Sequence, residues 1–403
     1  MKILHVIYGL PVNFGGPTEG LANLARAQAQ RGDDVTVLPC RFTSGPQTLP
    51  AGRDDRLHVL EPVTHGRLLW YDARVRRRVR ELARGCDIVH IHGTWRYHLL
   101  AAAAAADEYG IPYVIRPAGN LGVVSRSGKG LRKWLYLRLV ERRPFERAAA
   151  VHCTSLKEQR ELDGLPLRVR RCFIVPQPVS APPSDTRHDA SALGELCPAI
   201  EPADQVLLYL GRICAVKNLP IVLEAFLNLQ RDFERWHLVL AGYHEDVRLV
   251  ERLKQRAAQT SAARRVWLPG LVRGAAKTAC LARADLFAQA SKHENFGLSV
   301  AEALQFGVPC VASDGVALAA DVQQHGAGLM CPPTVADFTA NLRTLMADEA
   351  YRHQCAAAAR RLAERFAPAA VAEALDREYR ACLGEPISGQ AATAASGVGG
   401  RGI

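Results

Sequence analysis

Two acidic residues, Glu294 and Glu302, stand eight positions apart around a predicted helix start. The helix is expected to open near Gly297 and to end at a Gly-Val-Pro stop. Ionised carboxylates accept strong hydrogen bonds, and a pair of them suits the hydroxyls of a sugar. The free backbone N–H groups at the helix start suit an anion, and we assign them to Phe296, Gly297 and Leu298. This stretch therefore offers groups for a sugar diol and for a diphosphate.

Glu302 is also compatible with an ordinary solvated position on a helix surface, as most single glutamates are. However, Leu298 and Phe306 lie four residues to either side of it on the same helix face, which favours partial burial. Taken alone, the stretch is equally compatible with a ligand site and with a packed βα unit.

Two cations follow a predicted strand at the start of the second half of the chain. Gly211-Arg212 comes directly after the strand, and Lys217 stands five residues beyond the arginine. Arginine can grip a phosphate through two hydrogen bonds, and lysine adds a compact charge. The pair could neutralise a departing diphosphate in place of a metal ion. An exposed Arg and Lys are ordinary surface residues elsewhere, but their place in a strand-to-helix loop favours a site.

A glycine pair, Gly15-Gly16, lies between the first strand and the first helix. Glycines at this place let a phosphate approach the helix start, although a flexible turn would use them equally well. The Gly-x-Gly-x-x-Gly spacing of a dinucleotide site is missing. The end of the second strand, at 38–41, also lacks the acidic residue that binds an NAD ribose. These two absences count against a dehydrogenase.

Apolar strands and amphipathic helices alternate in both halves of the chain. Strands such as 3–8, 87–92 and 205–210 lack polar alternation, which is typical of a parallel sheet covered on both faces. A Pro-, Ser- and Asp-rich segment near 181–204 interrupts the alternation and is expected to be a linker. With 403 residues the chain suits two domains. We expect an α/β protein with two doubly wound domains and a ligand cleft at the carboxyl ends of both sheets.

The net charge of +11 is concentrated in one part of the chain. Residues 67–147 contain 17 Lys or Arg and 7 Asp or Glu, a net charge of +10. Within 131–147 the apolar residues and the basic residues fall on different faces at helical spacing, and one apolar residue is Trp134. Such a helix suits an anionic membrane surface, but the pattern slightly favours a core-packed helix with a solvated basic face. A nucleic-acid surface is a third option, and no binding motif accompanies it.

Several features favour a soluble protein of the cytosol. The longest apolar run, at 99–106, is far too short to span a bilayer, and the N-terminus lacks the layout of a signal peptide. The eleven cysteines contain no Cys-x-x-Cys pair, so neither a zinc site nor a disulfide framework is indicated. Buried free thiols in a reducing compartment are the simplest account. We expect a cytoplasmic protein, with a peripheral place on the inner face of the plasma membrane as an option.

Together, these segments resemble the retaining nucleotide-sugar glycosyltransferases of family 4 over roughly 1–383. The resemblance rests on Gly15-Gly16, on Arg212 with Lys217, and on the Glu-x7-Glu motif formed by Glu294 and Glu302. It implies a GT-B fold, in which two Rossmann-like domains face each other and the last helix crosses back to the first. The implied division is an N-terminal acceptor-binding domain at 1–180, a linker at 181–204, a C-terminal nucleotide-sugar-binding domain at 205–366, a crossing-back helix at 367–383 and a disordered tail at 384–403.

The resemblance also implies roles for the motif residues. Arg212 and Lys217 would contact the donor diphosphate, Glu294 the sugar hydroxyls and Glu302 the nucleotide ribose. The phosphate contacts of the backbone would come from Phe296, Gly297 and Leu298. It further implies transfer with retention of anomeric configuration, with no metal and no cofactor beyond the nucleoside-diphosphate sugar as co-substrate.

One segment resembles the loop near the acceptor in this family, and it contains His92 within His-Ile-His-Gly-Thr-Trp. A histidine at a strand end is more often structural, so we treat His92 as a candidate catalytic residue only. Two positions depart from the family. Ala118 stands where many members carry a histidine within Pro-His-Gly, so that Arg116, Asn120 or His92 would have to replace it unless it is dispensable. Gln177 stands where an asparagine is common.

The predicted activity is hexosyl transfer from a nucleotide-sugar donor to a glycan or polyprenyl-linked acceptor, in the biosynthesis of polysaccharide or cell-surface glycan. An anionic membrane surface is a further expected partner, and nucleic acid is not. Two other functions remain open. A sugar-nucleotide epimerase on the same fold would need no acceptor, and a non-enzymatic basic surface-binding protein would explain the charge but not the spacing of Arg212 and Glu294.

Overall fold

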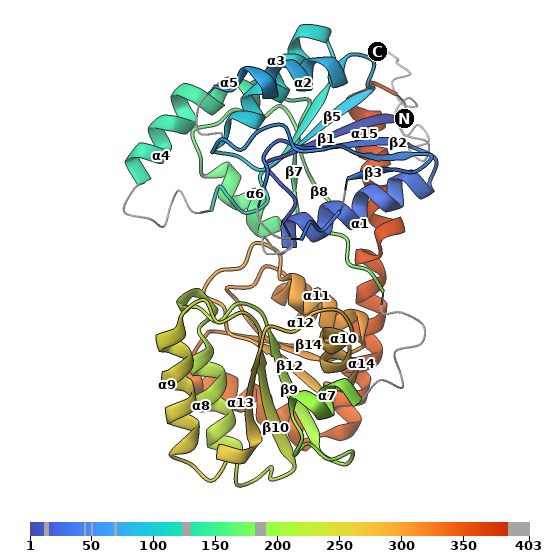
Figure 1. Cartoon of the computed structure of the whole chain (residues 1–403). Coiled ribbons are helices and arrows are strands. Elements are labelled where there is room, and N and C mark those ends of the chain that lie inside the picture. The colour runs from blue at the N-terminus through green and yellow to red at the C-terminus, as the bar shows by residue number, and fades with distance from the viewer. Residues whose placement is uncertain are drawn as a thin grey trace, which may run out of the picture.

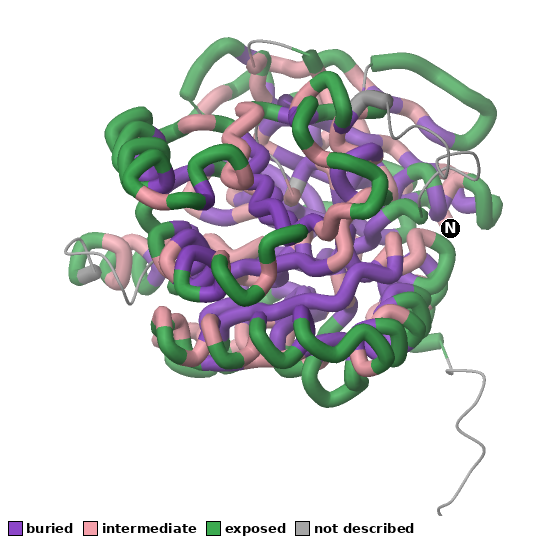
Figure 2. Tube along the Cα trace, turned by 90° about the horizontal axis from the view of Figure 1, so that it is seen from below, coloured by how far each residue is buried: buried purple, intermediate pink, exposed green. Residues whose placement is uncertain are grey.

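The computed structural model describes residues 1–11, 16–43, 46–49, 51–67, 71–122, 130–181 and 191–385. These residues form two lobes, each built around one sheet with helices on both faces (Figure 1). In Figure 2 the buried positions lie mainly inside the molecule, and the exposed positions lie mainly on its outside. The predicted α/β architecture with two doubly wound domains is confirmed.

The N-terminal lobe has an eight-stranded sheet in the order β3-β4-β2-β1-β5-β6-β7-β8, in which only the β3–β4 pair is antiparallel. Its strands are β1 (Lys2–Ile7), β2 (Asp34–Pro39), β3 (Gly52–Arg53), β4 (Leu57–Val59), β5 (Ile88–His92), β6 (Tyr113–Arg116), β7 (Ala150–Cys153) and β8 (Cys172–Ile174). Its helices are α1 (Gly16–Gln30), α2 (Ala73–Ala83), α3 (Tyr97–Tyr109), α4 (Gly130–Tyr136), the π-helical turn η2 (Leu137–Glu141), α5 (Arg142–Arg147) and α6 (Leu156–Asp163).

The C-terminal lobe has a six-stranded parallel sheet in the order β11-β10-β9-β12-β13-β14. Its strands are β9 (Gln205–Leu210), β10 (Trp236–Ala241), β11 (Val266–Gly270), β12 (Leu286–Gln289), β13 (Cys310–Ser313) and β14 (Gly328–Cys331). The helices from here to the end of the described chain are α7 (Ser191–Leu196), η4 (Ala215–Lys217), α8 (Leu219–Leu229), α9 (Val247–Ala258), η5 (Ala263–Arg265), α10 (Gly274–Arg283), α11 (Leu298–Gln305), α12 (Ala319–Gln324), α13 (Val335–Ala347), α14 (Glu349–Ala363), η6 (Glu364–Phe366) and α15 (Pro368–Cys382).

Helix α15 leaves the C-terminal lobe and packs on the N-terminal lobe beside α1, as expected of a crossing-back helix (Figure 1). Its residues Val371, Leu375 and Tyr379 are buried in one apolar cluster with residues of β1 and α1. The Tyr379 hydroxyl also lies 2.6 Å from Nδ1 of His90 on β5. This helix therefore ties the end of the chain to the first sheet. The predicted disordered tail falls almost wholly outside the described residues.

The helix expected at 131–147 is observed as one continuous helical run, α4, η2 and α5, with a π turn in its middle. Pro144 has no backbone N–H and would break the interior of a long helix. Pro144 lies in the continuing helical run three residues after the π turn, where the helix has to adapt to the missing N–H. The five residues of η2 adopt the wider π turn. Helix α7 lies within the predicted linker, and its Leu193 is buried in the core of the C-terminal lobe.

Among the described residues, no helix combines the length and the apolar character needed to cross a bilayer. All eleven cysteines are free thiols, and most of them are buried.

Candidate active site

A cavity of about 780 Å³ lies between the lobes, where the strands of both sheets end. Its lining includes eight predicted site residues: Gly16, Arg212, Lys217, Glu294, Phe296, Gly297, Leu298 and Glu302. His92 does not line it. Gly15 lies outside the described residues. The fold therefore brings together the three motif segments, at Gly16, at 212–217 and at 294–302, which lie far apart in the sequence.

The two predicted cations occupy the loop after β9. Lys217 is only 9% exposed, and its ammonium group forms an ion pair with the Glu294 carboxylate. Arg212 is more open, and its Nη1 donates to Oε2 of Glu245 at 2.5 Å. Partial burial opposes the charge of Arg212, but the hydrogen bond and the attraction of Glu245 outweigh it and raise its pKa. Both side chains thus lie at the edge of the cavity, each paired with a carboxylate.

The first predicted carboxylate is fixed from several sides. Besides the ion pair with Lys217, Oε2 of Glu294 accepts a hydrogen bond from Nε2 of Gln289 at 3.2 Å. Gln289 is held in turn by the Ser299 hydroxyl, which donates to its Oε1 at 2.9 Å. The Glu294 backbone N–H donates to the carbonyl of Gly315 at 2.9 Å. Glu294 is therefore an oriented acceptor, and its carboxylate remains partly exposed to the cavity.

Helix α11 starts at the cavity without a side-chain cap. Gly297 is its N-cap residue, with a φ of 102°, and a Cβ at this position would lie 2.8 Å from Cγ1 of Val316. This position therefore requires glycine. The helix thus opens where it was predicted, near Gly297, with Leu298 as its first residue. Its unpaired first-turn N–H groups are consequently those of Leu298, Ser299 and Val300, so Phe296 and Gly297 precede that turn.

The second predicted carboxylate is buried and paired, so it is not an ordinary surface residue. Glu302 is 8% exposed, and its Oε1 accepts a hydrogen bond from Nζ of Lys277 at 2.6 Å. Burial raises the pKa of Glu302, and the Lys277 ammonium opposes this rise. Lys277 Nζ also lies 3.9 Å from Oε1 of Glu19 on α1, in the other lobe. The sequence does not predict this interlobe ion pair, because Lys277 and Glu19 belong to no common sequence motif.

His92 lies in the interior of the N-terminal lobe and not in the cavity. It is 4% exposed, and its Nε2 lies 2.9 Å from Nδ1 of His5. Burial, with the nearby charges of His5 and Arg116, lowers the pKa of His92 well below its usual value. The imidazole is therefore neutral at physiological pH. A catalytic role would require the His92 side chain to reach the cavity, and these contacts do not bring it there.

Ala118 lines the cavity at the place of the expected family histidine, with a φ of 55°. The residues proposed to replace that histidine do not join it there. Arg116 is buried, and its Nη2 donates to Oε1 of Gln177 at 3.0 Å. The amide of Gln177 donates to the carbonyl of Gly16 at the start of α1. The backbone carbonyl of Asn120 accepts from Trp95 Nε1 at 3.0 Å. Arg116 and Gln177 thus connect β6 to the start of α1.

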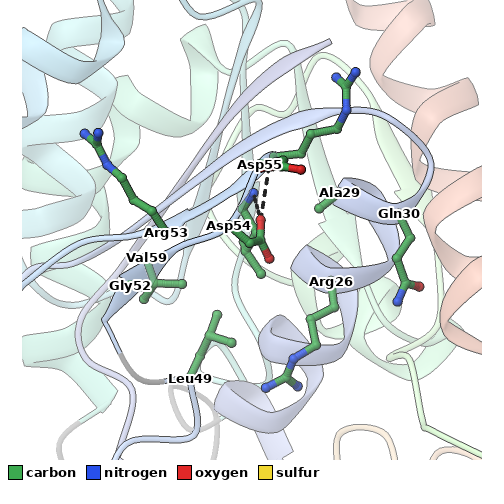
Figure 3. Close-up of a pocket in the computed structure, with 11 residues that line it drawn as sticks. Arg26, Ala29, Gln30, Leu49, Gly52, Arg53, Asp54, Asp55 and Val59 are labelled. Carbon is green, nitrogen blue, oxygen red and sulfur yellow. Dashed lines mark hydrogen bonds between the residues drawn. The ribbon is translucent and has the colours of Figure 1, made fainter.

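A second cavity of about 600 Å³ lies between α1 and the β3–β4 pair (Figure 3). Arg26, Arg53, Asp54 and Asp55 are among its lining residues. The Asp54 carboxylate accepts the backbone N–H of Arg56 at 3.1 Å, which is a turn-stabilising contact. None of the predicted site residues lines this cavity. We therefore take the interlobe cavity as the candidate active site.

Comparison with known proteins identifies both lobes. Residues 15–178 match the model of the glycosyl transferase 4-like domain, and residues 198–362 match that of glycosyl transferases group 1. A GDP-mannose:cellobiosyl-diphosphopolyprenol alpha-mannosyltransferase of Xanthomonas oryzae pv. oryzae is 25% identical over 324 residues, covering 78% of this chain and 79% of that protein. A D-inositol 3-phosphate glycosyltransferase of Jonesia denitrificans is 26% identical over 381 residues, covering 87% and 88% of the two chains.

Solved structures share the two-lobed fold. Anabaena Alr3699/HepE in complex with UDP-glucose superposes with a TM-score of 0.73 at 20% identity, over 94% of this chain and all of that one. WaaG, a glycosyltransferase involved in lipopolysaccharide biosynthesis, has a TM-score of 0.64 at 17% identity, over 96% of this chain and all of that one. The fold is therefore GT-B. Because the two family models lie on the two lobes and together span most of the sequence, the chain belongs to the group 1 glycosyltransferases of the family 4 kind.

Proposed function

We propose that this glycosyltransferase moves a hexose from a nucleoside-diphosphate sugar to a hydroxyl of a glycan or polyprenyl-linked acceptor, with retention of configuration and without a metal or cofactor. The observation that carries the proposal is the convergence of Arg212, Lys217, Glu294 and the start of α11 on one interlobe cavity. A relative that acts on a diphosphopolyprenol acceptor supports the acceptor class. Such an acceptor points to the assembly of polysaccharide or cell-surface glycan.

We place the donor in the cavity by the charges and hydrogen-bonding groups of the lining. Its diphosphate would lie between the Arg212–Lys217 pair and the unpaired N–H groups of α11, which provide positive charge on two sides. The sugar hydroxyls would donate to Glu294. The ribose hydroxyls would reach Glu302, which the Lys277 contact already holds in place.

Transfer requires the bond between the anomeric carbon and the diphosphate oxygen to break. The bonding electrons pass to that oxygen, and the cations around it stabilise the new charge. The acceptor hydroxyl attacks the anomeric carbon from the same face and loses its proton to the departing diphosphate oxygen. Approach of the two lobes, which the Glu19–Lys277 pair would favour, excludes water and limits hydrolysis of the donor.

The test has two stages. A thermal-shift series of nucleoside diphosphates and their sugars identifies the donor, because a ligand held at one hundred times its Kd stabilises the folded state by about 2.7 kcal/mol. The identified donor is then incubated with candidate acceptors, with and without EDTA, and the anomeric configuration of the product is read by NMR. We expect a glycoside of the donor's configuration at an unchanged rate in EDTA. An isomerised donor without a glycoside would identify an epimerase, and an inverted product or a loss of rate in EDTA would contradict the mechanism.

We further propose that α4, η2 and α5 rest on the anionic surface of a membrane, which would place the enzyme on the cytoplasmic face. Leu131 is 78% exposed and Leu139 is 71% exposed. Exposed basic residues accompany them, among them Arg132 and Arg138. Helix α4 projects from the N-terminal lobe (Figure 1). The core-packed alternative is not favoured, because these leucines are not covered by the described residues.

A double variant, Leu131→Gln with Leu139→Gln, should sediment with anionic vesicles at least about tenfold more weakly than the wild type, since burial of each leucine contributes about 1.5–3 kcal/mol when complete. Leu156→Gln is the matched control, because Leu156 is 51% exposed on α6, away from the basic segment. Wild-type binding should weaken at high salt. Equal binding to neutral and anionic vesicles, or equal binding by the double variant, would exclude this surface.

A further inference from the structure

Tyr8, Arg41 and Arg96 meet at the carboxyl edge of the N-terminal sheet, and none of them lines the donor cavity. They follow β1, β2 and β5, which are neighbours in the order β2-β1-β5. Because these strands are parallel, the segments after them emerge at the same edge. The Arg41 backbone N–H donates to the Tyr8 carbonyl at 2.9 Å, which fixes the two segments against each other.

Both guanidinium groups lie against one aromatic ring. The Cζ atom of Arg41 is 5.5 Å from the centroid of the Tyr8 ring, and that of Arg96 is 5.3 Å from it. A ring face attracts each cation, but two like charges around one ring repel each other. An anion bound at this ring would remove the repulsion. The two guanidinium groups at the Tyr8 ring are therefore suited to bind a negatively charged ligand.

No carboxylate of the described residues forms an ion pair with Arg41 or Arg96. The parts of this lobe that the structure does not describe, at 12–15, 44–45, 50, 68–70 and 123–129, contain no Asp or Glu. Other arginines of the lobe do have such partners: Arg147, for example, lies 2.8 Å from Asp107. In addition, Nε of Arg41 is buried without a hydrogen-bond partner among the described residues. Buried donors normally have a hydrogen-bond partner, so we expect a ligand at this edge to supply one for Nε of Arg41.

The start of α3 adds further donors beside Arg96. This helix has thirteen residues, and Arg96 is its N-cap residue and forms no side-chain cap. The preceding Trp95 has a φ of 68°, an unfavourable value for a bulky residue, and its backbone N–H donates to the buried Glu141. The hydroxyl of Thr94 is buried without a partner among the described residues. A constrained loop thus presents an uncapped helix start and an unsatisfied hydroxyl next to the two arginines.

We propose that Tyr8, Arg41, Arg96 and the first turn of α3 form a binding site for a phosphate group of the acceptor. Two planar guanidinium groups and a helix start match the charge and the oxygen geometry of a phosphate. The inference rests on the proposed function, since it assigns this edge of the N-terminal lobe to the acceptor. The phosphate could belong to a lipid diphosphate or to a soluble phosphorylated sugar, and both offer the same oxygens to the site.

The test uses the full chain with the donor site filled by a saturating nucleoside diphosphate. Binding of glucose 1-phosphate, and separately of farnesyl diphosphate in neutral detergent, is measured by titration calorimetry. The double variant Arg41→Gln with Arg96→Gln should lose affinity for the bound probe by about 10- to 100-fold, the range expected for lost charge-assisted hydrogen bonds. The corresponding double Lys variant should lose less, because it keeps the charge. Arg26→Gln, an exposed position on α1, is the control and should bind like the wild type.

Binding of glucose 1-phosphate supports a soluble phosphorylated acceptor, and binding of farnesyl diphosphate alone supports a lipid-linked one. Absence of saturable binding of both probes to the wild type, or equal affinity in wild type and double variant, overturns the proposal. The affinity for the nucleoside diphosphate is measured in each protein as well. Its preservation in the double variant shows that the chain is folded and the donor site intact. If the wild type binds a phosphate probe through these arginines but no nucleoside diphosphate, the proposed function fails and the phosphate site stands.

Discussion

Replacement of Lys217 by methionine should lower the rate of sugar transfer by about 10²- to 10³-fold, the effect typical of removing one preorganised group that stabilises developing charge. Lys217 is buried at the donor cavity, where its ammonium group contacts Glu294. Methionine keeps most of the aliphatic stem and removes only the charge. The diphosphate would then leave without the Lys217 charge, with Arg212 still beside it. The rate is measured by chromatography of the product, with the donor identified by thermal shift.

Two controls separate chemistry from folding. Lys254→Met removes an ammonium group that lies 3.0 Å from Glu251 on the exposed face of α9, and it should keep the wild-type rate. The melting temperature of the Lys217 variant should stay close to that of the wild type, because Glu294 retains its bond to Gln289 and access to solvent. A Lys217→Met enzyme with the full transfer rate would remove the leaving-group assignment. A variant that is inactive because it is unfolded would show a collapsed melting transition.

Much of the architecture could be predicted because parallel strands buried on both faces are continuous apolar runs. The bounds predicted for β9, 205–210, are those observed. Helix α2 was missed because its arginines obscure a short apolar stripe, in which Val75, Val79 and Ala83 recur every four residues and are all buried. The signal was present in that spacing, together with Asp72 as a capping residue. High charge does not exclude a helix that buries one narrow face.

The residues of the candidate site likewise fall into those that the sequence could predict and those that it could not. Glu294, Arg212 and Lys217 could be found because each follows a strand, and the carboxyl ends of parallel strands converge. Lys277 could not be found, because only tertiary packing brings it to Glu302. The position of the His92 side chain likewise depends on tertiary packing. His92 stands at a strand end, but the packing of the lobe buries it with His5 and away from the cavity. Local pattern locates a strand end, whereas long-range packing decides which side chains face the ligand.

Replacement of Glu141 by glutamine should change how the stability of the protein depends on pH. Glu141 lies fully buried in the π turn η2, and burial raises its pKa to about 8, opposed by the hydrogen bond from the Trp95 backbone N–H. In the unfolded chain the pKa returns to about 4.3. Between these values the folded protein holds a proton that the unfolded chain releases. The free energy of unfolding therefore falls as pH rises through this window, by about 1.4 kcal/mol per pH unit from this group alone.

Glutamine is neutral at every pH, and its side-chain oxygen can still accept the Trp95 N–H. The variant should match the wild type near pH 4.5 and become progressively more stable than it up to pH 8, with a difference on the order of 3 kcal/mol at pH 7. Urea unfolding of both proteins at several pH values measures this difference. The contributions of the other titrating groups cancel in it, because both proteins contain them. Glu146→Gln, on the exposed side of α5 beside Arg142, should show only a small difference. Parallel curves for the Glu141 variant and the wild type would mean that this carboxyl titrates normally. A confirmed difference would show that Glu141, which accepts the Trp95 N–H beside the proposed phosphate site, is protonated in the folded protein at neutral pH.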